Sequence, residues 1–165
     1  MPSLLSLSAL AKESVTICLE KNVTFGTAES CTGGLISAAV TDISGASAVF
    51  WGGIVSYDNR VKENLLGVEH ETLVTLGAVS AKTAEQMALG AVRALSVDFA
   101  VSVTGIAGPG GGTPEKPVGL VYIAVASTKG VITVKENHFK GEREEVRRQT
   151  VETALSMLIS AIEET

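Results

Sequence analysis

Apolar residues recur at intervals of three and four positions near both ends of the chain. Close to the start, an amphipathic helix over roughly 3–21 is predicted by this spacing, which holds for Leu4, Leu7, Leu10 or Ala11, Val15, and Cys18 or Leu19. The corresponding set near the end comprises Val146, Thr150, Ala154, Leu158 and Ile162. This second set predicts a final helix over about 142–163 that turns one face toward a core.

The sequence between these two helices alternates between strand-like and helix-like patterns. Runs rich in apolar and β-branched residues predict strands at 23–29, 48–57, 97–104, 120–127 and 131–139. Helical patterns predict helices at 35–40, from Asp58 to a stop at Gly67, and over 81–95 after a cap at Ser80. In the helix that follows Asp58, we expect Val61, Leu65 and Leu66 to point inward.

The order of these elements predicts an α/β fold. Helices and strands interleave, and the last two strands flank Lys129–Gly130 as in an antiparallel hairpin. A three-layer α/β sandwich, in which helices cover a mixed sheet, accommodates this order. The Gly52–Gly53 pair within a strand predicts a bulge or a close backbone approach. Because no repeat or composition break interrupts the chain, we expect one domain over 1–165.

The composition favours a globular protein and disfavours a nucleic-acid binder. Hydrophobic residues make up 45% of the chain and the mean hydropathy is +0.33, which is ample for a core. The formal net charge is −5 and aromatic residues make up only 4% of the chain. Nucleic-acid backbones require a basic face, and single strands require aromatic side chains for stacking. A local site for one phosphorylated small molecule is still compatible with this charge.

No metal, cofactor or membrane signal is apparent in the sequence. Cys18 and Cys31 are not spaced as a thiol pair, and with only His70 and His138 beside them no zinc-ligand set follows from spacing. No stretch of about 18 apolar residues occurs, and the first residues lack the basic region of an export signal. We therefore expect a cytoplasmic protein without a metal, a cofactor or a membrane association.

The first candidate site is AESCTGG, residues 28–34, where a strand gives way to a helix. Backbone amides at such a junction can hold an anion or a developing oxyanion. The candidate donors are the amides of Cys31, Thr32, Gly33 and Gly34. Ser30 lies beside them as the candidate nucleophile. Two alternatives stay open: a plain helix cap formed by Ser30 or Thr32, and Cys31 as the nucleophile, because thiols at helix N-termini are activated.

The second candidate site is YDNRVK, residues 57–62, where another strand ends and a helix begins. Lys62 would lie about one turn into that helix, so the helix dipole and partial burial would lower its pKa. A neutral lysine can act as a general base toward a serine hydroxyl, and Tyr57 could orient or relay the proton. The alternative is an ordinary solvated pair on the surface.

The third candidate site combines the long loop 105–119 with the start of the last helix. Its glycines and prolines predict a shaped, backbone-rich wall, to which Thr104, Gly105 and Gly108 would contribute. A plain connector is the alternative. Arg143 and Arg147 share a helix face and could clamp a phosphate, although nearby glutamates make surface ion pairs the ordinary interpretation.

Four segments, taken together, resemble one family. They are AESCTGG (28–34), GGIVSYDNRVKENLLGV (52–68), VTGIAGPGGGTPEKPVG (103–119) and GEREEVRRQTVETAL (141–155). In this order they are similar to the nicotinamide-nucleotide amidohydrolases, which are also known as the C-terminal domain of the CinA competence/damage-inducible proteins. The similarity extends over nearly the whole chain.

The resemblance implies hydrolysis of the carboxamide of nicotinamide mononucleotide to nicotinate mononucleotide and ammonia, without a metal. Ser30, Tyr57 and Lys62 match the family's motif serine, tyrosine and lysine, and Arg143 or Arg147 matches its motif arginine. Many members have Tyr-Ser/Thr-Asn where this chain has Tyr57-Asp58-Asn59, and we expect little effect because Asp also caps helices. The resemblance further implies a stand-alone domain and a homo-oligomer.

Two functions of different classes follow from these patterns. The first is a serine amidase with Lys62 as its base, acting on nicotinamide mononucleotide. The second is a catalytically silent nucleotide-binding module linked to competence or DNA damage, in which Ser30 only caps a helix. We expect the first, because a binding module has no need for a nucleophile paired with a base.

Overall fold

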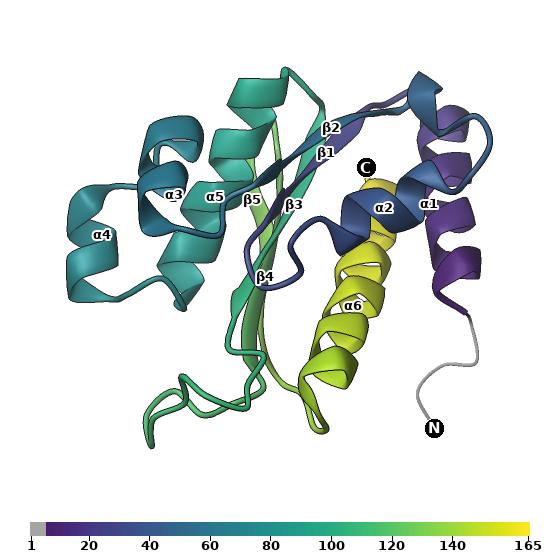
Figure 1. Cartoon of the computed structure of the whole chain (residues 1–165). Coiled ribbons are helices and arrows are strands. Elements are labelled where there is room, and N and C mark those ends of the chain that lie inside the picture. The colour runs from purple at the N-terminus through teal and green to yellow at the C-terminus, as the bar shows by residue number, and fades with distance from the viewer. Residues whose placement is uncertain (1–5) are drawn as a thin grey trace.

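The computed structural model describes residues 6–165 and contains one five-stranded sheet between two layers of helices (Figure 1). The strands are β1 (Phe25–Glu29), β2 (Phe50–Val55), β3 (Phe99–Gly105), β4 (Leu120–Ser127) and β5 (Gly130–His138). The α-helices are α1 (Leu7–Lys21), α2 (Leu35–Thr41), α3 (Asn59–Leu66), α4 (His70–Thr75), α5 (Ala81–Leu95) and α6 (Arg143–Glu163), and a short 3₁₀ helix spans Ala46–Ala48. This architecture confirms the predicted α/β sandwich with a mixed sheet.

The strands follow the order β2-β1-β3-β4-β5 across the sheet. β1 lies parallel to both β2 and β3, whereas β4 runs antiparallel to β3 and β5 antiparallel to β4. The predicted hairpin at Lys129–Gly130 is confirmed by the β4–β5 pair. The predicted bulge is also present, because the β1–β2 register skips Trp51 immediately before the glycine pair. In consequence, the carboxyl ends of three parallel strands meet at one edge of the sheet.

Each face of the sheet carries its own hydrophobic core. In Figure 1, α1, α2 and α6 cover one face and α3, α4 and α5 cover the other. The first core joins α1 and α6 to the sheet through side chains such as Val15, Val101 and Leu158. The second core is built on α5, with Met87 and Ala88 packed against the sheet. The alanines of α5 in this core allow the helix to lie close to the sheet, and α3 packs on α5.

The predicted inward face of α3 is partly wrong. Leu66 is buried as expected, but Leu65 is 58% exposed and Val61 is only partly buried. Lys62 is buried instead, with 1% of its surface exposed. The helix is turned about its axis so that Lys62 and Leu66, four residues apart, face the protein. Apolar spacing could not predict this rotation, because the partners of Lys62 are polar groups from other segments.

The predicted helix boundaries agree well with the structure elsewhere. The side chain of Asp58 accepts a hydrogen bond from the amide of Arg60 and caps α3, which ends at Gly67 in a left-handed conformation. Ser80 caps α5 through the amide of Thr83. The expected first helix begins at Leu7 in the structure, and positions 3–5 of that prediction lie outside the described residues. α4 was not predicted, because six residues are too few for a periodic signal.

Residue Gly90 of α5 explains how closely α3 can approach. A Cβ atom added at this glycine would overlap the carbonyl oxygen of Leu66, at the end of α3. Any larger residue would push α3, and Lys62 with it, away from the sheet. Across residues 6–165, no helix combines the length and the apolar character needed to cross a membrane.

Candidate active site

Ser30 lies at the carboxyl end of the central parallel strand. Its amide donates to the carbonyl of Val103 in β3 at 3.1 Å, and the amide of Ser56 after β2 donates to the carbonyl of Glu29 at 2.8 Å. These bonds extend the sheet past the last residue of β1 and fix Ser30 between its two neighbours. In α/β folds, ligands bind outside the carboxyl ends of parallel strands. The position of Ser30 therefore coincides with the place where such a fold presents its site.

Lys62 reaches Ser30 from α3. Its Nζ lies 3.0 Å from the Oγ of Ser30, 2.7 Å from the carbonyl oxygen of Ser56 and 3.2 Å from that of Tyr57. Burial lowers the pKa of Lys62, and the negative charge of Asp58 opposes this effect. The lowered pKa confirms the direction expected from the sequence.

The three neighbours of the Lys62 nitrogen can all accept from an ammonium, and the two carbonyls among them can also hold a neutral amine. A neutral amine has two N–H bonds and one lone pair. The carbonyl oxygens of Ser56 and Tyr57 can only accept, so they take the two N–H bonds. In the structure Lys62 donates its third hydrogen to the hydroxyl oxygen of Ser30; once the amine is neutral, its lone pair faces that hydroxyl and can take its proton. This is the arrangement that a general base needs before it removes a proton.

A cavity of about 190 Å³ opens in front of this pair. It is lined by Ser30, Cys31, Tyr57, Lys62, Ala78, Val79, Thr104, Gly105, Ala107 and Arg143. Seven of these ten residues were expected from the sequence to belong to the site, namely Ser30, Cys31, Tyr57, Lys62, Thr104, Gly105 and Arg143. Ala78, Val79 and Ala107 were not. The hydroxyl of Thr104 donates to the carbonyl of Ala78 at 2.7 Å, so this side chain joins β3 to the segment before α5.

Cys31 is a poor candidate for the nucleophile. It is buried, and burial raises the pKa of its thiol to about 12, with the charge of Glu29 acting in the same direction. The reactive form of cysteine is the thiolate, which a pKa this high leaves almost unpopulated near neutral pH. Of the two adjacent candidates, Ser30 is favoured, because it lies next to the amine of Lys62 and because the Cys31 thiol has a raised pKa.

The expected oxyanion donors are only partly available. α2 begins at Leu35, so residues 31–34 form a turn before it, and the amide of Gly33 donates to the carbonyl of Ser30 at 3.1 Å. The prediction for Gly33 is therefore wrong, because the tight turn uses its amide. Within residues 6–165, the amides of Thr32 and Gly34 have no hydrogen-bond acceptor, and the amide of Cys31 has none apart from its own sulfur. Gly33 and Gly34 adopt positive φ angles of 59° and 108°, which L side chains rarely adopt.

Two amides in the first turn of α2, those of Ile36 and Ser37, are occupied by Glu29, a residue that the sequence interpretation missed. The carboxylate of Glu29 is 0% exposed and accepts from the amides of Ile36 at 2.9 Å and Ser37 at 3.0 Å. It also accepts from the hydroxyl of Thr32 at 2.6 Å. One signal for it was present, since an acidic residue at the end of a fully buried strand must find several donors.

Tyr57 contacts Lys62 through its backbone carbonyl, and it also lines the cavity. Its carbonyl holds the nitrogen of Lys62, whereas its side chain lies at the cavity and is 64% exposed. Among the described residues, its hydroxyl has no hydrogen-bond partner. The ring is thus free to contact a ligand, and its role in relaying a proton stays a prediction.

The two candidate arginines have different surroundings. Arg143 lies at the cavity and donates to the carbonyl of Gly108 at 2.8 Å, which draws the glycine-rich loop to the start of α6. Arg147 donates from Nε to the carbonyl of Cys31 at 3.0 Å and from a terminal nitrogen to that of Thr32 at 3.1 Å. Arg147 is therefore committed to the backbone of the turn. Arg143 is the better placed of the two for a phosphate.

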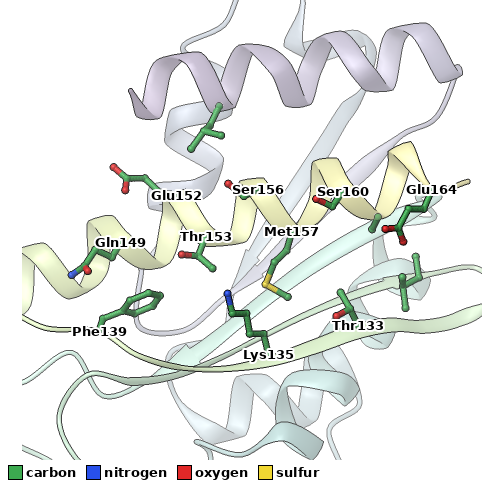
Figure 2. Close-up of a pocket in the computed structure, with 13 residues that line it drawn as sticks. Thr133, Lys135, Phe139, Gln149, Glu152, Thr153, Ser156, Met157, Ser160 and Glu164 are labelled. Carbon is green, nitrogen blue, oxygen red and sulfur yellow. The ribbon is translucent and has the colours of Figure 1, made fainter. Parts of the chain in front are cut away.

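A larger groove lies elsewhere, between β5 and α6 (Figure 2). Its volume is about 700 Å³, and Figure 2 shows Lys135, Met157, Thr153 and Phe139 along it. Within the part of the chain that the structure describes, no lysine or histidine along this groove forms a hydrogen bond with a serine or threonine hydroxyl. Volume alone would select this groove, but the chemistry of the lining selects the smaller cavity at Ser30.

The sequence matches a family model described as the CinA C-terminal domain over residues 7–162. A CinA-like protein of Leptospira borgpetersenii serovar Hardjo-bovis (strain L550) is 53% identical over 140 residues, which cover 85% of this chain and 34% of that protein. A putative competence-damage inducible protein of Acetivibrio thermocellus gives the same identity and coverage. The chain thus spans about a third of the length of these curated relatives.

Solved structures support the same relationship. The crystal structure of competence/damage inducible protein CihA from Agrobacterium tumefaciens has a TM-score of 0.92 at 49% identity, with 94% of each chain covered. A CinA superfamily protein from Klebsiella pneumoniae 700603 has a TM-score of 0.93 at 29% identity, covering 97% of this chain and 99% of that one. Fold, sequence and the family match over residues 7–162 lead to one conclusion: the chain belongs to the CinA C-terminal domain family.

Proposed function

We propose that this protein is a serine amidase that hydrolyses the carboxamide of nicotinamide mononucleotide to nicotinate mononucleotide and ammonia. The observation that carries the proposal is the buried amine of Lys62 at 3.0 Å from the hydroxyl of Ser30. Within residues 6–165 no carboxylate forms an ion pair with Lys62, and a buried lysine of this kind is costly to maintain, so its presence beside a serine at the end of a strand indicates chemistry. The resemblance to nicotinamide-nucleotide amidohydrolases supports the choice of substrate.

In the first half of the reaction, the Oγ of Ser30 attacks the carboxamide carbon while Lys62 takes the hydroxyl proton. The oxygen of the tetrahedral intermediate is then negatively charged and needs donors. The free amides of Cys31, Thr32 and Gly34 are the candidates within the turn. The C–N bond breaks as the ammonium of Lys62 returns the proton to the leaving nitrogen, so ammonia departs and an ester to Ser30 remains.

In the second half, water hydrolyses the ester. Lys62, neutral again, takes a proton from the attacking water and passes it to the Oγ of Ser30 as the ester bond breaks. The product is a carboxylic acid, which ionises at neutral pH. The same nitrogen thus serves as base and acid in turn, as in other hydrolases that use one base beside a nucleophile.

The size and charge of the cavity support a pyridine nucleotide. A volume of about 190 Å³ is below that of a cavity enclosing a drug-sized ligand, and suits an aromatic ring with its carboxamide. Ribose and phosphate would then extend toward the rim. Arg143 lies there with an exposed side chain, and arginine binds phosphate in a bidentate manner.

An ammonia-release assay tests the proposal. The purified protein is incubated with nicotinamide mononucleotide, nicotinamide riboside or nicotinamide, and ammonia is measured with an enzyme-coupled assay. We expect release from the mononucleotide, with a kcat/KM at least about tenfold above that for the riboside because of the phosphate contact. Tight binding of the mononucleotide without ammonia release would favour a silent nucleotide-binding module instead.

A further inference from the structure

We propose that Glu29 is a positioning residue for this reaction, whose buried carboxylate holds the turn of residues 30–34 so that Ser30 faces Lys62. The inference rests on the proposed function, because it assigns Glu29 a part in the same site. Glu29 does not line the cavity and would not touch the substrate. Its effect would pass through the backbone and through Thr32.

Both carboxylate oxygens of Glu29 accept from α2, and Oε1 also accepts from the turn. Oε1 accepts from the hydroxyl of Thr32 at 2.6 Å and from the amide of Ile36 at 2.9 Å. Oε2 accepts from the amide of Ser37 at 3.0 Å and from its hydroxyl at 2.8 Å. Thr32 is therefore the one side chain by which the carboxylate grips the turn itself, and Ser37 belongs to the helix.

The partners of Glu29 require a carboxylate at this place. The two amides can only donate, and the hydroxyls of Thr32 and Ser37 donate here. A charged carboxylate in a buried position is stable when it accepts several such bonds. A glutamine of the same size would present N–H groups toward donors on one of its two sides.

The backbone of Glu29 connects this carboxylate to both reacting groups. Ser30 follows it directly, and the carbonyl of Glu29 accepts from the amide of Ser56 at 2.8 Å. The carbonyl of Ser56 in turn accepts from the amine of Lys62 at 2.7 Å. A displacement of Glu29 would thus move the nucleophile and the base relative to each other. Errors of about 1 Å in such geometry can lower a rate by about 10²-fold.

Arg147 holds the opposite side of the same turn. Its guanidinium donates to the carbonyls of Cys31 and Thr32. Because C=O and N–H point to opposite sides of a trans peptide, the amide of Thr32 is directed away from Arg147. Glu29 and Arg147 therefore fix the turn from two sides and leave the amide of Thr32 free.

The test compares four variants at equal folded concentration, well below their melting temperatures. E29Q removes the charge, T32V removes only the hydroxyl that Glu29 grips, and T32S restores that hydroxyl. S37A removes a bond on the helix side and serves as the control. Two rates are measured: ammonia release from nicotinamide mononucleotide, with kcat and KM separated, and covalent labelling of Ser30 by a fluorophosphonate, followed by intact mass.

We expect E29Q to lower kcat about 10²-fold and T32V about tenfold, each with KM changed less than about threefold. T32S should regain most of the kcat that T32V loses, and S37A should lower the melting temperature while kcat stays within about twofold of the parent. Fluorophosphonate labelling should follow the same order. Equal losses of kcat in S37A and T32V, or unchanged kcat in E29Q, would show that Glu29 only caps α2 and overturn the proposal.

The labelling rate separates this inference from the proposed substrate. If the parent labels at Ser30 but releases no ammonia, the proposed function fails and the order of labelling rates still decides the role of Glu29. If the parent neither labels nor releases ammonia, Ser30 is not a nucleophile and both proposals fall.

Discussion

The amine nitrogen of Lys62 lies 3.0 Å from the hydroxyl oxygen of Ser30, 32 residues away in the sequence. Two backbone carbonyls take the remaining hydrogen-bonding positions of this nitrogen. The lysine is thereby held in place by groups that accept from it whether it is charged or neutral. Its lowered pKa then makes the neutral form more accessible than in solvent.

The first prediction concerns the chemical nature of the base. Lys62→Arg keeps the positive charge and roughly the length, but a guanidinium does not release its proton near neutral pH. We expect ammonia release to fall by about 10³-fold or more, because a nucleophile that has lost its base is nearly as inactive as a site that has lost both groups. Measured kcat within about tenfold of the parent would rule out Lys62 as the base.

The second prediction concerns the pH dependence of kcat/KM. Asp58 raises the pKa of Lys62 through its charge, while its own pKa is lowered to about 2 by hydrogen bonds from Arg60. The reactive lysine is the neutral one, so kcat/KM should rise with pH through the Lys62 pKa. Asp58→Asn removes the negative charge, lowers that pKa further and should shift the acid limb to lower pH by about a few tenths of a unit.

The matched control for this shift is Asp42→Asn, at the end of α2. Asp42 is also exposed and undergoes the same chemical change, but it is not among the charges that act on the Lys62 pKa. The Asp58→Asn variant would still cap α3, because asparagine is as good a cap as aspartate. A shift of the acid limb to higher pH in Asp58→Asn, or an equal shift in Asp42→Asn, would contradict the assignment.

The third prediction distinguishes the arginines of α6. Arg143→Ala should raise KM for nicotinamide mononucleotide by about 10- to 100-fold, the value of one hydrogen bond between charged groups, and should change the riboside reaction little. Arg148→Ala is the control, because Arg148 pairs with Glu152 on the surface. Steady-state kinetics on both substrates provide the measurement. Equal losses on the mononucleotide and the riboside would assign Arg143 a structural role through Gly108.

The parts of the fold that were predictable are those that rest on local patterns. The helix over α6 and the β4–β5 hairpin follow from spacing and turn residues alone, and both are present. The link between Ser30 and Lys62 could be inferred only by combining two motifs, since no periodicity joins residues 32 positions apart. The rotation of α3 that buries Lys62 depends on carbonyls of other segments and could not be read from apolar spacing.

The remaining differences have the same physical origin. The strand-to-helix junction suggested four free amides at residues 31–34, whereas two glycines with positive φ shape a turn that uses the amide of Gly33. The commitment of Arg147 to the carbonyls of Cys31 and Thr32 joins α6 to a turn about 115 residues earlier. Contacts between residues so far apart in the sequence are decided by the packing of the whole sandwich, and local sequence patterns do not predict them.

The assignment of Ser30 as the nucleophile is tested most directly by measuring binding and turnover together for two neighbouring variants. Nicotinamide mononucleotide is titrated calorimetrically into the parent, Ser30→Ala and Cys31→Ala, and ammonia release is measured on the same samples. We expect Ser30→Ala to bind the nucleotide but to release no ammonia above background, whereas Cys31→Ala should keep most of its activity. An active Ser30→Ala variant beside an inactive Cys31→Ala variant would contradict the assignment of Ser30 as the nucleophile.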